Sequence, residues 1–83
     1  MIEVLFFGRF GDLAQGVPGA FDLTDEVSTP ARIRDGLQRL SPELTAELNQ
    51  PQVLVAVNQQ VSSWDTQLSD GDEVAFLPPV TGG

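Results

Sequence analysis

The chain has 83 residues, a length that suits one small domain burying about 60% of the surface its unfolded form exposes. A hydrophobic content of 41% allows a folded core, while a net charge of −8 makes nucleic acid a poor partner. Because cysteine and histidine are both missing, disulfides, thiolate catalysis and the commonest zinc ligand are excluded. No apolar run approaches the ~20 residues of a membrane span and no signal-like segment opens the chain, so we expect a cytoplasmic protein without membrane contact.

The N-terminal stretch predicts two strands joined by a loop. Residues 2–7 are mostly β-branched or aromatic, which is typical of a strand. Glycines and prolines are frequent between residues 8 and 19, so we expect a loop there, with one helical turn around residues 12–14. Residues 20–23 alternate apolar and polar side chains, which suits a short strand that returns antiparallel to the first.

Two helices are expected next. The first has Ser28 or Thr29 as its N-cap and Pro30 at its first helical position, where a missing N–H costs nothing. Its apolar side chains recur at spacings of four and three and form one stripe: Ile33, Leu37 and Leu40. Ser41 and Pro42 open a shorter second helix in the same way, with two leucines facing inward: Leu44 and Leu48.

The C-terminal third predicts three more strands. Residues 53–57 are continuously apolar, as in a strand covered on much of both faces, and Val61 begins a brief strand after a turn at 58–60. Residues 69–72 carry a tight-turn pattern before the last strand, residues 73–77, and we expect the exposed acids of that turn, Asp70 and Asp72, to keep ordinary pKa values. Elements in this order predict an α+β fold, in which a mixed sheet of about five strands packs on one main helix and a short second helix.

Side-chain alternation along the outer strands predicts which residues turn away from the core. Period two turns five side chains toward the helix: Ile2, Val4, Phe6, Val74 and Phe76. Phe7 and Leu77 then fall on faces whose other members indicate exposure, and Val61 can join them. Two interpretations stay open: a short helix or loop covers these three residues, or they form a protein-docking patch beside the C-terminus.

The last six residues form a segment of unusual composition that follows the predicted domain, residues 1–77. The segment, residues 78–83, consists of Pro78, Pro79, Val80, Thr81, Gly82 and Gly83. The two prolines fix two φ angles and favour an extended course, and six residues reach about 20 Å. Only glycine lets a backbone be gripped closely on all sides. We therefore predict a tail that is stiff at its base, bare at its tip and able to enter a narrow channel in another protein.

Charge is distributed unevenly along the chain. All four basic residues are arginines, and three of them, Arg32, Arg34 and Arg39, fall in residues 30–40 with a single acid, Asp35. That stretch therefore has a net charge of +2. The remaining residues have a net charge of −10, which gives −8 for the whole chain. We therefore expect a protein partner with a basic surface, and the rate of association should depend on the salt concentration.

The chain resembles the small subunits of molybdopterin synthase (MoaD) in the ThiS/MoaD family of sulfur carriers. The resemblance covers essentially the whole length and is strongest in "IEVLFFG", in "VAVNQQ" at 55–60 and in "LSDGDEVAFLPPVTGG" at 68–83. It is loose at residues 12–19 and 49–52. The resemblance implies a β-grasp, ubiquitin-like fold and a carrier that is not an enzyme on its own, binds no cofactor or metal, and belongs to a heterotetramer of two small and two large subunits.

The resemblance also implies a chemistry for the C-terminus. An ATP-dependent, MoeB-like activating enzyme adenylates the carboxylate of Gly83, and a sulfur donor protein completes its conversion to a thiocarboxylate. The tail then enters a MoaE-like large subunit, where the sulfur passes to cyclic pyranopterin monophosphate. Phe7, Val61 and Leu77 match the hydrophobic contact that this family makes with both partners, so the two partners are expected to bind in turn.

Three other interpretations stay open. The chain can be a ThiS-like sulfur carrier of thiamine biosynthesis, although such carriers are usually shorter and lack an ending like "FLPPVTGG". It can be a ubiquitin-related modifier that forms isopeptide bonds with lysines of other proteins. It can also be a plain binding module with an inert tail, a function that the stiff, bare-tipped terminus disfavours.

Overall fold

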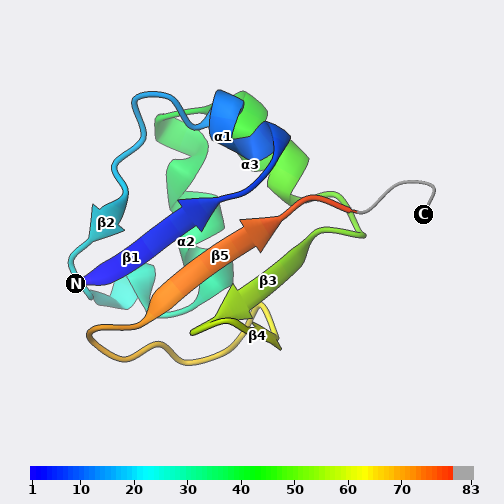
Figure 1. The fold of residues 1–83 in the computed structure, drawn as a ribbon. Coiled ribbons are helices and arrows are strands. Elements are labelled where there is room, and N and C mark those ends of the chain that lie inside the picture. The colour runs from blue at the N-terminus through cyan, green and yellow to red at the C-terminus, as the bar shows by residue number, and fades with distance from the viewer. Residues whose placement is uncertain (80–83) are drawn as a thin grey trace.

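The first and last strands lie side by side in the middle of one sheet (Figure 1). The structure, a computed structural model, describes residues 1–79. β1 (Ile2–Phe6) pairs in parallel with β5 (Glu73–Leu77), and β2 (Ala20–Phe21) runs antiparallel at the other edge of β1. β3 (Leu54–Val57) is antiparallel to β5, and β4 (Gln60–Ser62) is antiparallel to β3. The sheet order β2-β1-β5-β3-β4 confirms the predicted mixed sheet of five strands.

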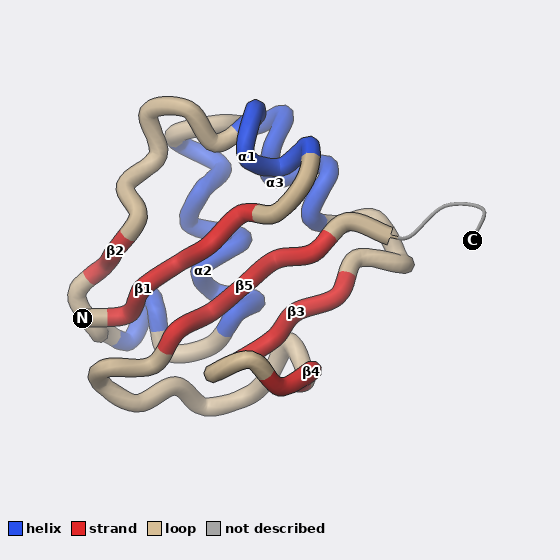
Figure 2. The backbone as a smooth tube through the Cα atoms, viewed as in Figure 1, coloured by secondary structure: helices blue, strands red, loops and turns tan. Residues whose placement is uncertain are grey.

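The helices lie together on one side of this sheet (Figure 2). They are α1 (Arg9–Leu13), α2 (Pro30–Gly36) and α3 (Pro42–Leu48), with two short 3₁₀ helices, η1 (Asp25–Val27) before α2 and η2 (Leu37–Arg39) after it. The helical turn expected around residues 12–14 is a helix that begins earlier, at Arg9. One layer of helix on one layer of sheet leaves the opposite sheet face uncovered.

Short polar side chains start α2 and α3 as the sequence predicts. The Thr29 hydroxyl oxygen accepts a hydrogen bond from the backbone N–H of Arg32 at 3.2 Å, and Ser41 does the same for Leu44 at 3.2 Å. Proline follows each cap directly. Thr29 is therefore the cap of α2, while the Ser28 hydroxyl donates to the Asp25 carbonyl at 2.9 Å and closes η1.

The apolar stripe of the main helix is shorter than the sequence predicts. Ile33 and Leu37 are buried as expected, but Leu40 is 56% exposed, so its predicted inward position is wrong. α2 ends at Gly36 and continues as the 3₁₀ helix η2, which has about three residues per turn. Leu40 lies beyond the end of η2 at Arg39, where the chain turns toward α3, so the predicted helical stripe stops at Leu37.

The core fills the space between the helices and the sheet. Of the five side chains predicted to face inward, Ile2, Val4, Val74 and Phe76 are buried and Phe6 is partly buried. The Phe76 ring lies between two others, with centroids 5.6 Å from Phe6 and 5.6 Å from Trp64. The predicted inward leucines of α3, Leu44 and Leu48, complete this layer.

β3 differs from expectation on one of its faces. Val55 and Val57 are buried against the core, as a continuously apolar strand predicts. Leu54 is 47% exposed, because alternation turns it toward the uncovered side of the sheet. The expectation that this strand is covered on much of both faces is therefore wrong for Leu54.

The turn before β5 is held by the hairpin between β3 and β4. Asn58 and Gln59 have positive φ angles of 51° and 69°, which suits a tight hairpin turn. The Asn58 amide donates to the Asp72 carboxylate at 2.9 Å, and its oxygen accepts from the Glu73 N–H at 3.0 Å. The Ser69 N–H donates to the other Asp72 oxygen at 2.8 Å. The Ser69 bond and then the Asn58 bond lower the pKa of Asp72, which corrects the ordinary value expected from sequence.

These bonds predict a dependence of stability on pH. The folded-state pKa of Asp72 lies below its ordinary 3.8, so the stabilisation is present above that pH and is lost as pH falls through the folded-state value. Asp72→Asn should lower the free energy of unfolding at pH 7 by on the order of 1 kcal/mol. In urea titrations, the difference from wild type should shrink as the pH falls below 3.8 and disappear below the folded-state pKa. Asp65→Asn removes the same charge from an exposed loop and serves as control. A loss of stability in Asp72→Asn that does not change with pH would contradict the prediction.

Candidate functional site

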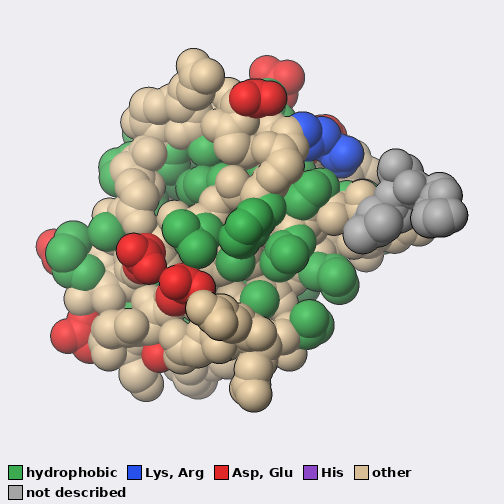
Figure 3. All heavy atoms as spheres, viewed as in Figure 1, with side chains coloured by type: hydrophobic (Ala, Val, Ile, Leu, Met, Phe, Trp, Pro, Cys, Tyr) green, Lys and Arg blue, Asp and Glu red, His purple; other side chains and the backbone are tan. Residues whose placement is uncertain are grey.

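The sheet face opposite the helices carries an apolar surface, which we call the open sheet face (Figure 3). It forms a shallow hollow of about 380 Å³. The side chains that line it are Leu5, Phe7, Leu54, Ala56, Gln59, Val61, Glu73, Ala75 and Leu77. Acidic side chains border the apolar ones in Figure 3. An uncovered apolar surface with a polar border is typical of a protein-docking site.

Strand register explains why this face is hollow. Leu5 lies opposite Ala75 in the β1–β5 pair, and Ala56 lies opposite Ala75 in the β3–β5 pair. Two alanines therefore occupy the middle of the face. Leu54 pairs with Leu77 at the end of the face from which the chain leaves the sheet. Small central residues with larger neighbours leave space for a side chain of a partner.

All three residues predicted to form a docking patch line the open sheet face. Phe7 is 47% exposed and Val61 is 72% exposed, while Leu77 is partly buried. Within residues 1–79, neither a helix nor a loop covers them, which decides against the first of the two interpretations. Their role in binding a partner stays a prediction.

The sequence prediction missed part of this face. The predicted patch does not include Leu5, Ala75, Leu54 or Ala56, although period two along the first and last strands puts Leu5 and Ala75 on its side. The alternation within residues 53–57 was a sufficient indication for Leu54 and Ala56, since every second residue of a strand shares a face. The continuous apolar run concealed it.

The base of the tail sits against the loop after β1. Gly8 has φ +57°, and the Pro78 Cγ atom lies 2.9 Å from the position that a Cβ atom at residue 8 would occupy. Glycine is thus required both by the backbone conformation and by the proline ring. The Phe7 N–H donates to the Phe76 carbonyl at 3.1 Å and continues the strand pairing up to this point. The remaining predicted tail residues, Val80, Thr81, Gly82 and Gly83, lie outside the described residues.

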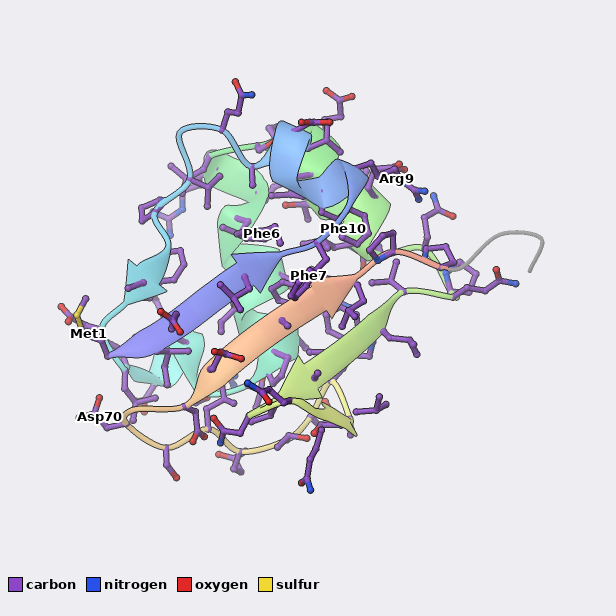
Figure 4. The ribbon with its side chains drawn as sticks, in the orientation of Figure 1. Met1, Phe6, Phe7, Arg9, Phe10 and Asp70 are labelled. Atoms are coloured by element: carbon purple, nitrogen blue, oxygen red, sulfur yellow. The ribbon has the colours of Figure 1, made fainter. Side chains whose placement is uncertain are left out.

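A second hollow, of about 290 Å³, lies beside Pro79, and we call it the root hollow. It is lined by Arg9, Glu47, Gln50, Pro51, Gln52 and Pro79. The Arg9 Nε atom lies 3.2 Å from a carboxylate oxygen of Glu47, and the guanidinium lies 5.5 Å from the centre of the Phe10 ring. Figure 4 shows Arg9 at the start of α1, near the end of the sheet to which β5 runs.

Within residues 1–79, no three metal-binding side chains gather in one place, and no helix is long and apolar enough to cross a membrane. The described chain offers instead an apolar face that leads along β5 into a proline-stiffened segment. Such an arrangement can bind a protein and direct the chain that follows into it.

The contact between Gly8 and Pro78 can be tested with glycine substitutions. Gly8→Ala should lower the free energy of unfolding by roughly 1 kcal/mol or more beyond Gly16→Ala. Both have a positive φ, but Gly8 also has ψ −137°, outside the left-handed α region, and meets a proline ring. The measurement is urea unfolding of both variants. The part of the excess cost that comes from the ring should vanish in a Pro78→Ala background. An excess that is unchanged in that background would show that the ring contact is unimportant.

Known proteins resemble this chain over its full length. The family model described as ThiS family matches residues 4–83. The molybdopterin synthase sulfur carrier subunit of Escherichia coli (strain K12) is 40% identical over 83 residues, which is all of both chains.

Solved structures resemble it as well. A chain in the complex of subunits 1 and 2 of molybdopterin-converting factor from Helicobacter pylori 26695 is 26% identical, with a TM-score of 0.59 over 99% of this chain and 97% of that one. The crystal structure of SAMP1 from Haloferax volcanii is 23% identical, with a TM-score of 0.72 over 99% and 98%. The second likeness concerns the fold alone, and it confirms the ubiquitin-like β-grasp that the sequence resemblance implied.

Proposed function

This chain belongs to the ThiS family, and on that premise we propose that it is the sulfur carrier subunit of a molybdopterin synthase, with its C-terminal glycine as the reacting residue. The full-length identity of 40% to a subunit of that name supports the proposal. The single observation that carries it is the continuity of β5, which runs from the open sheet face directly into Pro78 and Pro79. A partner bound to that face is placed to receive the tail.

The chemistry begins at the carboxylate of Gly83. A carboxylate is a poor electrophile, so an ATP-dependent activating enzyme joins it to AMP and releases pyrophosphate. A donor protein then delivers sulfur at the sulfide level, as HS⁻, which attacks the acyl carbon. AMP leaves, so the C–O bond to AMP is exchanged for a C–S bond without any oxidation or reduction. The product is a thiocarboxylate, which is anionic at neutral pH and has a polarizable, nucleophilic sulfur.

The large subunit of the synthase provides the second half of the reaction. The tail inserts into its active site, and the thiocarboxylate sulfur passes to cyclic pyranopterin monophosphate. This chain thus supplies the reagent, and the large subunit supplies the catalytic groups. The lack of histidine, cysteine and lysine in the sequence is compatible with that division of labour. A complex of two such subunits has been solved for the Helicobacter pylori proteins, which supports the proposed partnership.

Because both partners use one docking surface, they cannot bind to it at the same time. Leu77 lies at the end of the open sheet face and directly precedes the tail, so a protein that holds the tip of the tail also covers this face. The activating enzyme and the large subunit therefore bind in turn. The thiocarboxylate travels with the carrier between them.

The proposed chemistry is tested by the intact mass of the protein. Incubation with ATP, a sulfur donor and the cognate activating enzyme should add the mass that corresponds to exchange of one oxygen for sulfur at Gly83. A chain extended by one residue beyond Gly83 should show no gain and no downstream activity. Activity of the extended chain without removal of the added residue would rule out the mechanism.

The same preparation distinguishes the alternative functions. Reconstitution with the large subunit and cyclic pyranopterin monophosphate should yield the dithiolene product. Sulfur delivery only to thiazole synthesis would favour the thiamine carrier, and Gly83 joined to lysines of cellular proteins would favour a protein modifier.

Docking through the open sheet face is tested by Leu77→Glu. The substitution places a charge on the apolar face, so affinity for the large subunit should fall by about 2 kcal/mol or more, roughly thirtyfold. Because Leu77 is only partly buried, the free energy of unfolding should change by about 1 kcal/mol or less. Leu40→Glu makes the same chemical change at an exposed leucine in the helical layer and should bind normally. Calorimetry that found equal affinities for the two variants would contradict docking at Leu77.

A further inference from the structure

Arg9 is the one basic residue of the chain outside residues 30–40. The other three arginines belong to α2 and η2, in the helical layer. On the molecular face seen in Figure 3, basic side chains gather at one place, at the edge toward which β5 runs. Figure 4 labels Arg9 there, and Arg9 shares the root hollow with Pro79. An acidic chain thus keeps one isolated cation at the point where its tail begins.

The guanidinium of Arg9 is oriented by its neighbours, but they do not occupy all of its hydrogen-bond donors. Glu47 contacts the Nε atom at 3.2 Å, and the group lies over the Phe10 ring. Within residues 1–79, neither of the two terminal Nη atoms makes a hydrogen bond, and the side chain is 47% exposed. An exposed ion pair such as Arg9–Glu47 contributes little to folding, so its main effect is to hold the guanidinium in place.

We propose that Arg9 is a docking residue that binds a carboxylate side chain at the mouth of the partner channel into which the tail inserts. This inference rests on the proposed function. Pro79 forms part of the wall of the root hollow, so a protein that encloses the tail beyond Pro79 passes directly over the guanidinium. Two free Nη atoms match the two oxygens of a carboxylate in a bidentate contact.

The position of Arg9 makes this contact a control on how far the tail enters. Pro78 lies against Gly8, the residue that precedes Arg9, so the guanidinium and the base of the tail lie side by side. Four residues of fully extended chain span at most about 14 Å, so the position of the root limits how far the terminal carboxyl group can reach. A fixed contact at the root therefore limits the depth of insertion.

Surrounding charges predict the kinetic character of the contact. Glu47 shares the root hollow and Asp12 lies in the same short helix, so the local net charge around Arg9 is not positive. Long-range attraction of a partner carboxylate is consequently weak, and the contact depends on directional hydrogen bonds made after encounter. Its loss should raise the dissociation rate and leave the association rate nearly unchanged.

The test compares variants of the full-length chain in binding to the large subunit, with rates measured by surface plasmon resonance. Arg9→Gln should weaken binding about tenfold, and Arg9→Glu should weaken it further, mainly through faster dissociation. Arg39→Glu is the matched control: it changes the net charge equally, from a helical-layer position, and should bind within about twofold of wild type. Reversal of one acid at the mouth of the partner channel should restore binding of Arg9→Glu.

A second control separates docking from an internal role of the ion pair. Glu47→Gln breaks the pair but keeps the two Nη atoms, so binding should stay within about threefold of wild type. A loss in Glu47→Gln as large as in Arg9→Gln would show that only the internal pair matters and would overturn the inference. Equal weakening in Arg9→Glu and Arg39→Glu, or unchanged binding in Arg9→Gln, would overturn it as well.

Failure of this inference differs from failure of the proposed function. Wild-type protein that neither binds the large subunit nor becomes thiocarboxylated would refute both. Wild-type protein that binds and transfers sulfur, while the Arg9 variants do the same with unchanged rates, would refute the docking role of Arg9 alone.

Discussion

The parallel pairing of β1 with β5 brings the first and last strands of the chain together, and the rest of the molecule is arranged around it (Figure 1). Val4 lies opposite Val74 and Phe6 opposite Phe76, at the centre of the sheet. Closing so long a loop costs conformational entropy, which the burial of these apolar pairs offsets. The pairing continues beyond the strands to Phe7, so Pro78 comes to rest on Gly8. The direction in which the tail leaves is therefore a property of the core.

The sheet has two apolar faces, and only one of them stabilises the fold. Ile2, Val4 and Val74 are buried against the helices, whereas Leu5 in β1 and Phe7 directly after it stay on the uncovered side. Alternation along a strand makes these two sets independent, so the uncovered set can be shaped for a partner without disturbing the core. Pro78 and Pro79 then follow directly at the end of this face.

Charge adds a second level of organisation. The acids of the chain are spread around the molecule, and three arginines are confined to α2 and η2, where Arg34 also lies 4.8 Å from the centre of the Trp64 ring. Arg9 alone is placed at the root of the tail. Net negative charge attracts a basic partner over a distance, while a single oriented guanidinium acts only at contact. Long-range attraction of the partner and its alignment at contact therefore depend on different charged groups.

Local sequence determined the elements of this protein, because caps and alternation act over a few residues. Thr29 and Ser41 begin helices as their patterns predict, and the outward positions of Phe7 and Leu77 follow from period two. The whole-chain resemblance, with its diglycine ending, indicated the family.

Only tertiary structure decided how distant residues meet. The seating of Pro78 on Gly8, the pair of Arg9 with Glu47 and the lowered pKa of Asp72 each join residues that no local pattern relates. The exposure of Leu54 likewise depended on which sheet face the helices cover. Such contacts arise from the path of the folded chain, and the path is set by packing of the whole core rather than by the preferences of neighbouring residues.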